Sequence, residues 1–430
     1  MPKIKGQYFP YKVRNMKECQ YANSELPDYK CKRECHAGSH FCVFHTSEEE
    51  RSETFPEKFC DELNKLHESK DGDWVGFIFP KTYKLAKLEV DYDINLSYST
   101  FGKIEISEGT FHNSLNLDNC FFKDDSSFHC TFDGSTNFSK CIFWGRTRFG
   151  GNFNHDQTNF GACTFHDAIT FLGGYDITFN CQSSNTSEKI RRLFINETDM
   201  RDINFYRPER VKFVGVDMSK LLLLGTDLSG VHLYDTKWFQ EALSRNGLRD
   251  EIWVHRTNGK EFQKYFLPRI ESQYRNVRVA LEANKNFTFA SDFYIGEMEI
   301  RRKKLNPLRR YFFSIEAFYN ALSQYGANPI RASRILLYFF LIHVLLSIYF
   351  QQPEIHFFLF EKLNLESLGT IFSEIIKYSI NSLKVLTLQR FGTFIENGIV
   401  QSLIDTFFRL IGPFQIALFV MSMRNRIKRN

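Results

Sequence analysis

The residues with the clearest potential for chemistry lie in one short segment near the N-terminus, CQYANSELPDYKCKRECHAGSHFCVFH at positions 19–45. The predicted metal ligands are Cys19, Cys31, Cys42 and His45. Cys42 and His45 are close enough in sequence for one tight turn to present both, and two remote thiolates complete the tetrahedral set that Zn²⁺ prefers. Four protein ligands leave no position open for a substrate, so we expect a structural zinc ion.

Three more residues of this segment are alternative ligands: Cys35, His36 and His40. A second alternative is that the cysteines are free cytosolic thiols. The N-terminal sequence MPKIKGQYFPYKVR has no apolar stretch, so we expect no signal peptide and a reducing compartment, where cysteines bind metal or pack more often than they form disulfides. The segment has little apolar material besides Val43 and Phe44, so a bound metal would supply much of its folding free energy.

The rest of the chain carries no recognisable catalytic motif. It has no P-loop, no dinucleotide-binding glycine fingerprint and no G-x-S-x-G sequence, so we expect no enzymatic activity. The formal net charge of +5 is too small to indicate a nucleic-acid partner. The unusual feature of the composition is its 46 phenylalanines, and their spacing predicts the main fold.

Phenylalanine recurs at a regular interval in the middle of the N-terminal half. Phe149, Phe160 and Phe171 end successive eleven-residue blocks, and each block contains a second Phe near its middle, at Phe143, Phe153 and Phe165. The step from Phe138 to Phe143 and that from Phe160 to Phe165 are five residues, and the step from Phe143 to Phe149 is six. A helix is excluded because the block GGNFNHDQTNF opens with two glycines, which cost about 1 kcal/mol each in a helix. The alternation of five and six suits short strands separated by turns, four of which close a coil of about 22 residues in a solenoid.

A small residue stands two positions before most of these rings, as Cys141 stands before Phe143 and Cys163 before Phe165. We expect both side chains of each pair to point inward, where a narrow coil has room for only one large group. These cysteines are therefore predicted to be buried filler and not metal ligands. The predicted core rings are Phe111, Phe122, Phe132, Phe138, Phe143, Phe149, Phe153, Phe160, Phe165 and Phe171.

This pattern resembles the pentapeptide-repeat family in its Phe-rich form, which implies a right-handed quadrilateral β-helix. The resemblance is clear from Phe101 to Phe171, is interrupted by QSSNTSEKIRR, and is predicted to resume at INETDMRDINF, residues 195–205. The cysteine-rich segment is similar to a small module found ahead of such repeats, and that similarity favours Cys31 over Cys35 as a ligand. The fold implies no activity by itself.

A helical pattern replaces the repeats from Lys237 to Leu305. IESQYRNVRVALEANKN and FTFASDFYIGEMEIRRKKL are predicted to be two helices joined at 284–287. Glu297 and Glu299, followed by Arg301 and Arg302, are expected on a solvated, ion-paired face. A similar hairpin occurs in proteins that join pentapeptide repeats to a membrane segment, and LSQYGANPIRASR resembles the linker in those proteins.

Two apolar blocks follow, at 335–350 and 410–421. The first has 16 residues and the second reaches spanning length only with SLIDTFF before it, against about 20 residues for a membrane span. Buried core helices are the alternative. The basic flank of each block lies away from the 351–402 segment, so the positive-inside rule predicts a multi-pass membrane protein with both termini in the cytoplasm.

The segment between these blocks resembles the pore module of two-span potassium channels, in which a helix leads into a Thr-x-Gly-aromatic-Gly filter. Thr387, Leu388, Phe391 and Gly392 match that pattern, while Gln389 and Arg390 replace its first glycine with one extra residue. The positive charge of Arg390 argues against potassium selectivity and leaves conduction open. An interfacial or ordinary re-entrant helix at 366–400 is the alternative.

The chain is thus expected to be a mixed multidomain protein. The predicted domains are a zinc-binding module at 1–70, a pentapeptide-repeat β-helix at 71–236, a helical hairpin and linker at 237–330, and a two-span transmembrane domain at 331–430.

Two functional hypotheses remain. The first is an ion-channel-like membrane protein, tetrameric by resemblance, whose cytosolic β-helix senses or scaffolds. The second is a membrane-anchored scaffold whose β-helix binds a protein partner while the spans only tether it. The expected partners are membrane lipid, further copies of the chain and a protein on the β-helix, with no nucleic acid.

Overall fold

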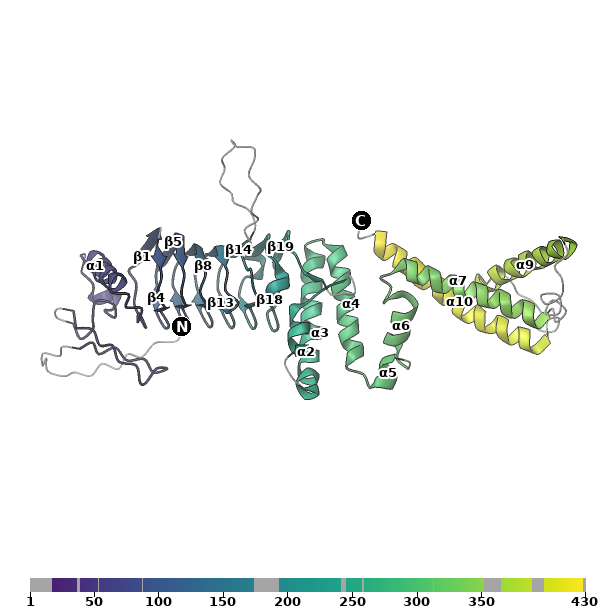
Figure 1. Cartoon of the computed structure of the whole chain (residues 1–430), viewed down its shortest axis with the longest axis horizontal. Coiled ribbons are helices and arrows are strands. Elements are labelled where there is room, and N and C mark those ends of the chain that lie inside the picture. Colours follow the sequence, from purple (N-terminus) through teal and green to yellow (C-terminus); the bar gives the residue numbers. More distant parts are fainter. Residues whose placement is uncertain are drawn as a thin grey trace, which may run out of the picture. The chain divides into compact units, whose positions relative to one another are not determined.

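The computed structural model describes residues 18–427 except 37–38, 53, 87, 174–192, 241–244, 257–258, 312, 352–364 and 389–397. The chain divides into two compact units, residues 1–262 and 263–430, which we describe separately. The first unit contains a stack of short strands and the second consists of helices (Figure 1).

The first unit is a β-solenoid of about six turns, as predicted, built from three sheets of parallel strands. The longest sheet runs along two adjoining sides of the coil and contains β1 (Thr82–Ala86), β5 (Lys103–Phe111), β8 (Ser126–Phe132), β11 (Thr147–Phe153), β14 (Ile169–Leu172), β17 (Val211–Val214) and β19 (His232–Tyr234), with β2 (Glu89–Val90) paired to β5.

The two remaining sides of the coil carry strands of two residues each. One sheet contains β4 (Thr100–Phe101), β7 (Phe121–Phe122), β10 (Ile142–Phe143), β13 (Thr164–Phe165) and β16 (Asn204–Phe205). The other contains β3 (Ile94–Asn95), β6 (Leu115–Asn116), β9 (Thr136–Asn137), β12 (Thr158–Asn159), β15 (Thr198–Asp199) and β18 (Leu221–Leu222).

The short elements outside this stack complete the unit: 3₁₀ turns η1 (Glu48–Glu50), η2 (Pro208–Arg210) and η3 (Met218–Lys220), helices α1 (Phe55–Glu68) and α2 (Arg249–Arg256), and an antiparallel pair, β20 (Phe239–Gln240) and β21 (Asn246–Gly247).

Strand register places the phenylalanines of successive coils directly above one another. Phe143 pairs with Phe122 on one side and with Phe165 on the other, which gives a repeat of 21 or 22 residues, close to the predicted value. The Phe143 ring stacks on these rings with centroids 4.4 and 4.8 Å apart. All ten predicted core rings are buried. The stack therefore has a continuous aromatic interior.

The small residues beside these rings fill the remaining space. Cys141 and Cys163 are fully buried, and their thiols donate hydrogen bonds of 3.0 Å to the backbone carbonyls of Leu117 and Phe138. Burial raises the pKa of both thiols well above the ordinary value, so they stay protonated. These cysteines behave as filler.

The repeat also continues beyond the interruption, as predicted. β13 pairs with β16 and β14 pairs with β17, so strands more than 35 residues apart in sequence occupy neighbouring coils. Residues 174–192 are not among those described, but the strands on either side of them keep the register of the stack.

Helix α2 closes the far end of the solenoid. Its buried Asp250 accepts hydrogen bonds from the backbone N–H groups of Leu223 and Leu224, at 3.0 and 2.8 Å. In the interior of the stack such groups bond to the next coil, so this carboxylate takes the place of a missing coil. Burial raises the pKa of Asp250 to about 6, even though these hydrogen bonds favour the charged form.

The second unit contains helices only among its described residues. They are α3 (Lys260–Ala283), whose first turn belongs to the preceding unit, α4 (Phe287–Lys303), α5 (Pro307–Tyr311), α6 (Ile315–Ser323), α7 (Pro329–Gln351), α9 (Leu365–Leu386) and α10 (Gly398–Ile427). Two stretches, Pro329–Phe350 and Ile399–Asn425, are long and apolar enough to cross a membrane.

The predicted hairpin corresponds to α3 and α4, but the expectation of a solvated acidic face was wrong for Glu297. This side chain is only 4% exposed and accepts hydrogen bonds from Arg275 and Arg278 of α3, at 2.9 and 3.2 Å. Glu271 is similarly buried and pairs with Arg301 and Lys304. The ion pairs thus join the two helices, because the Glu297 carboxylate of α4 is covered by arginines of α3 and the Glu271 carboxylate of α3 is covered by Arg301 and Lys304.

We expect replacement of one core ring to destabilise the solenoid strongly. Phe143→Ala should lower the free energy of unfolding by about 3–5 kcal/mol, because a stacked ring is lost from a close-packed interior. Denaturant unfolding in detergent, followed by circular dichroism, measures the change. Trp144→Ala is the matched control, since the neighbouring ring is 49% exposed and its loss should cost no more than about 1 kcal/mol. Equal effects of the two changes would contradict the inward placement of Phe143.

The end cap gives a second expectation. Asp250→Ala leaves two buried N–H groups without an acceptor and should destabilise the last coil by about 2–4 kcal/mol. Hydrogen exchange at residues 221–224 should become faster, while coils far from α2 keep their protection. Asp227→Ala, at an exposed carboxylate that also accepts a backbone bond, is the control and should have little effect. Unchanged exchange in Asp250→Ala would show that α2 does not cap the stack.

Candidate metal centre and filter-like segment

Two chain segments and one turn position the predicted metal ligands. The segments bearing Cys19 and Cys31 are held together by an antiparallel bridge between Glu18 and Glu34 and by the bond from Cys19 N–H to the Arg33 carbonyl, 2.9 Å. Cys42 and His45 lie in a tight turn, in which His45 N–H donates to the Cys42 carbonyl at 3.0 Å.

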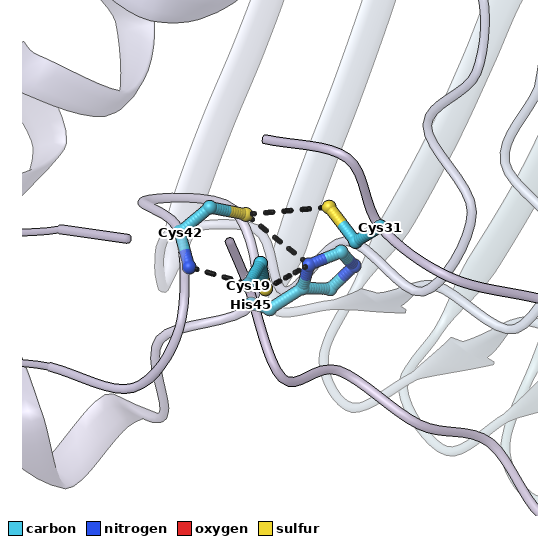
Figure 2. A group of neighbouring side chains, drawn as sticks. All are labelled: Cys19, Cys31, Cys42 and His45. Carbon is cyan, nitrogen blue, oxygen red and sulfur yellow. Dashed lines mark hydrogen bonds between the residues drawn. The ribbon is translucent and has the colours of Figure 1, made fainter. Parts of the chain in front are cut away.

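All four predicted ligands come together and are buried (Figure 2). Their ligand atoms lie within 4.8 Å of one another. His45 Nδ1 is 3.2 Å from Cys42 Sγ and 3.4 Å from Cys19 Sγ, and the sulfurs of Cys31 and Cys42 are 4.0 Å apart. A tetrahedral zinc ion would hold such atoms about 3.5–3.8 Å apart, given Zn–S and Zn–N distances of about 2.3 and 2.0 Å. The cluster therefore has the dimensions of a metal site.

The imidazole of His45 is oriented by contacts outside the cluster. Its Nε2–H donates to the backbone carbonyl of Val75 at 2.9 Å, so the lone pair of Nδ1 faces the sulfurs. The ring of Tyr21 stacks on it, with centroids 3.9 Å apart. Gly76 makes room for Tyr21, since a Cβ at this position would lie 2.0 Å from the tyrosine oxygen, and its φ of +70° suits glycine.

Sequence reasoning missed both of these supporting residues. Val75 acts through its backbone carbonyl, so its side chain carries no signal of the role. Tyr21 lies inside the cysteine-rich segment, and an aromatic residue two positions after a ligand is the one hint that was available.

Hydrogen bonds within the cluster favour the thiolate form of one of its cysteines. Hydrogen bonds from the Cys19 and Cys42 thiols lower the pKa of the Cys31 thiol, outweighing its burial. Burial alone would lower the pKa of His45, but its interactions with Cys19 and Cys31 raise it to about 9. The thiolate is the form of cysteine that binds metal, and a cation bound here would displace the imidazole proton.

The alternative ligands lie outside the cluster. The thiol of Cys35 donates to the backbone carbonyls of Glu18 and His40, at 3.1 and 3.4 Å, and so has partners other than the four ligands. Neither His36 nor His40 belongs to the group of converging ligand atoms found among the described residues. The geometry therefore agrees with the choice of Cys31 over Cys35.

Aromatic packing fixes the metal centre to the start of the solenoid. The ring of Phe44, next to His45, stacks on Phe77 with centroids 4.2 Å apart, and Ile78 N–H donates to the Phe44 carbonyl at 2.8 Å. The guanidinium of Arg33 lies over the Phe77 ring, 5.1 Å from its centroid. The module and the first coil thus share one core.

The filter-like segment begins at the C-terminal end of α9. The hydroxyl of Thr387 donates to the Leu383 carbonyl at 2.7 Å, and Leu388 has a φ of +60°, a left-handed conformation that ends the helix. Three other residues of the predicted filter, Arg390, Phe391 and Gly392, lie outside the described residues.

The end of α9 packs closely against α10 at Gly412. A Cβ on Gly412 would lie 3.0 Å from the Cα and from the carbonyl oxygen of Leu386. Gly412 is the central residue of the candidate span Ile399–Asn425. Val385 and Leu386 also form a buried apolar cluster with Phe408 of α10. The last turn of α9 therefore lies at the middle of the longer apolar helix.

Comparison of the chain with protein-family models, with curated proteins and with solved structures finds no match.

We expect the purified protein to contain one zinc ion per chain, because four buried ligand atoms converge on one point. Elemental analysis of a Cys42→Ser, His45→Ala double variant should show this zinc lost. Cys35→Ser is the matched control and should keep it, since that thiol bonds elsewhere. Equal metal content in the wild type and the double variant would rule out the site.

Proposed function

We propose that the chain is an oligomeric, channel-like membrane protein, tetrameric by resemblance to two-span channels, with a β-solenoid domain that senses or scaffolds. The observation that carries this proposal is the position of α9. It lies between the two candidate spans in sequence, packs against both, and ends beside the centre of α10.

A helix that ends at mid-membrane implies a re-entrant loop. Gly412 is 14 residues from the start of α10 at Gly398, which corresponds to about 21 Å along the helix. The end of α9 and the start of α10 are therefore separated by about this distance along α10, which is the separation expected if α9 belongs to a segment that enters and leaves on the same side. The last carbonyls of any helix lack partners within the helix, so they need hydrogen bonds from water or protein, or contact with an ion. In membrane proteins, non-helical backbone within the hydrocarbon region occurs only where it lines a cavity or is buried in protein.

Exposed apolar surface on α9 supports an assembly of several copies. Phe372, Ile376, Ile380 and Leu383 follow a helical spacing and form one stripe, with exposed fractions between 43% and 66%. In a single chain this stripe has no cover among the described residues. Lipid and neighbouring copies of the chain would cover it in a membrane assembly.

The charge pattern supports a cytoplasmic solenoid. Arg331 and Arg334 lie at the start of α7, and Arg424 and Arg426 lie at the end of α10. By the positive-inside rule these ends face the cytoplasm, and α9 enters from the opposite side. We assign the solenoid to the pentapeptide-repeat type because most sides of its 21- or 22-residue coils carry a large buried apolar residue with a small residue two positions before it. We assign Zn²⁺ to the cysteine cluster.

The alternative, a membrane-anchored scaffold, is favoured by one feature of the solenoid surface. Trp144, His166 and Tyr206 from successive coils stack on one another, with centroids 3.9 and 4.3 Å apart, and both Trp144 and Tyr206 are about half exposed or more. Exposed aromatic rings of this kind are common at protein interfaces. In this case the apolar helices would only tether the solenoid.

The two functions differ in oligomeric state and in conduction. The full chain is purified in detergent, its mass is measured, and it is reconstituted into planar bilayers for current recording. The channel proposal expects a closed oligomer and single-channel currents. A monomer without current would overturn it and leave the scaffold.

A variant of Gly412 tests the role of α9. Gly412→Val places side-chain atoms against the Leu386 backbone and should displace the end of α9, so that the oligomer remains but the current is lost. Val420→Leu, at an exposed position of the same helix, is the control and should conduct as the wild type does. Unchanged current in Gly412→Val would contradict a pore that includes the end of α9.

A further inference from the structure

Five polar side chains form a cluster inside the apolar helices. They are His343 and Ser347 of α7, Ser382 of α9, and Gln401 and Asp405 of α10, and none is more than 7% exposed. His343 lies seven residues before the end of the candidate span at Phe350, or about 10 Å along the helix. Given a hydrocarbon core of about 30 Å, the cluster lies within membrane depth.

His343 connects all three helices. Its Nε2 is 3.1 Å from Asp405 Oδ1, and its Nδ1 is 2.8 Å from Ser382 Oγ. The amide nitrogen of Gln401 donates to Asp405 Oδ1 at 2.7 Å and to Ser347 Oγ at 3.0 Å. The imidazole is thus the only titratable group in the cluster besides the carboxylate.

This network keeps its hydrogen bonds whether or not His343 is charged. In the neutral ring Nε2–H donates to Asp405 and Nδ1 accepts from the Ser382 hydroxyl. In the charged ring both nitrogens donate, and the same hydroxyl accepts, because a serine oxygen can do either. A proton can therefore be gained or lost at Nδ1 with only a rotation of the Ser382 hydroxyl.

Burial of the Asp405 carboxylate favours binding of a proton by His343. With a neutral imidazole, the Asp405 charge is buried without a counter-charge from His343, which is costly in an apolar interior. With a charged imidazole the two form a neutral pair. The cluster as a whole is then uncharged.

Among the described residues of the three helices, three further ionisable groups lie within one turn of His343, Ser382 or Asp405 in sequence. Arg409 is one turn from Asp405 on α10 and is half-buried, and it adds a positive charge that opposes protonation. On α9, Tyr378 is buried one turn before Ser382, and Lys384 is exposed. On α7, the sequence within one turn of His343 contains no ionisable residue.

An unfilled acceptor in the same cluster marks a place for a water molecule. The side-chain oxygen Oε1 of Gln401 is buried and has no hydrogen-bond donor among the described residues, although its amide nitrogen makes two bonds. A water molecule that donates to this oxygen would stand beside the carboxylate. A buried polar group of this kind is satisfied by ordered water in most proteins.

We propose that His343 and Asp405 form a proton-binding site inside the apolar helices, where one proton is bound and released at His343 Nδ1. The site stands on this geometry alone and does not require the helices to conduct. Ser382 lies one turn before the end of α9, so the bound proton decides whether the hydroxyl donates to α7 or accepts from it. Proton binding thus acts on the contact that fixes the end of α9.

The test follows the protonation of His343 directly. The full chain is labelled with ¹⁵N in its histidine rings, reconstituted into liposomes, and studied by solid-state NMR between pH 4 and pH 9. The signals that disappear in His343→Gln are assigned to His343. We expect them to pass from a neutral to a doubly protonated ring within this range. Asp405→Asn, which removes the counter-charge, should lower the proton affinity of His343 at least about tenfold.

His166→Gln is the matched control, because it removes a histidine of the solenoid surface and should leave the His343 titration unchanged. A His343 ring that keeps one protonation state throughout the range in the wild type would overturn the proposal. An unchanged titration midpoint in Asp405→Asn would do the same. If Asp405→Asn does not assemble, the titration of His343 in the wild type still supports or overturns the proposal without it.

Discussion

The main constraint on the first unit is that each coil of the solenoid must be completed by its neighbour. A coil alone leaves its backbone N–H and C=O groups unpaired on both faces and exposes its aromatic rings. A single coil is therefore unstable, and the fold is stable only when several coils are stacked. The rings supply the apolar contact and the parallel ladders satisfy the backbone. The ring stacking and the backbone ladders both stop at the two ends of the solenoid. There, another element must cover the last rings and satisfy the last backbone groups.

The structure closes the two ends differently. At the start, the cysteine-rich module packs Phe44 on the first coil and receives the Val75 carbonyl of that coil as a hydrogen-bond acceptor for His45. At the finish, α2 inserts a carboxylate that accepts two backbone donors of the last coil. The cysteine-rich module and a buried acid thus have the same role, which is to end a repeat that has no intrinsic limit.

The sequence was most informative where one property repeats. The ring spacing predicted the coil because the same spacing recurs from coil to coil. The Cys/His cluster could be predicted because few residue types have side chains that bind transition metals. Contacts made by single residues could not be predicted in this way. The burial of Glu297 depends on arginines about 20 residues earlier, and His343 pairs with Asp405, which lies 62 residues later in the chain. The choice of Cys31 over Cys35 came from resemblance, since spacing alone allowed both.

The register of the solenoid also makes its length adjustable in fixed steps. Each coil adds one strand spacing, about 4.8 Å, along the axis, and the strands on both sides of 174–192 stay in register despite the extra residues between them. Removal or duplication of one 21- or 22-residue unit would therefore change the separation of the two closed ends by a known increment while leaving both ends intact. The number of coils thus sets the distance between the cysteine-rich module and α2, in steps of one coil.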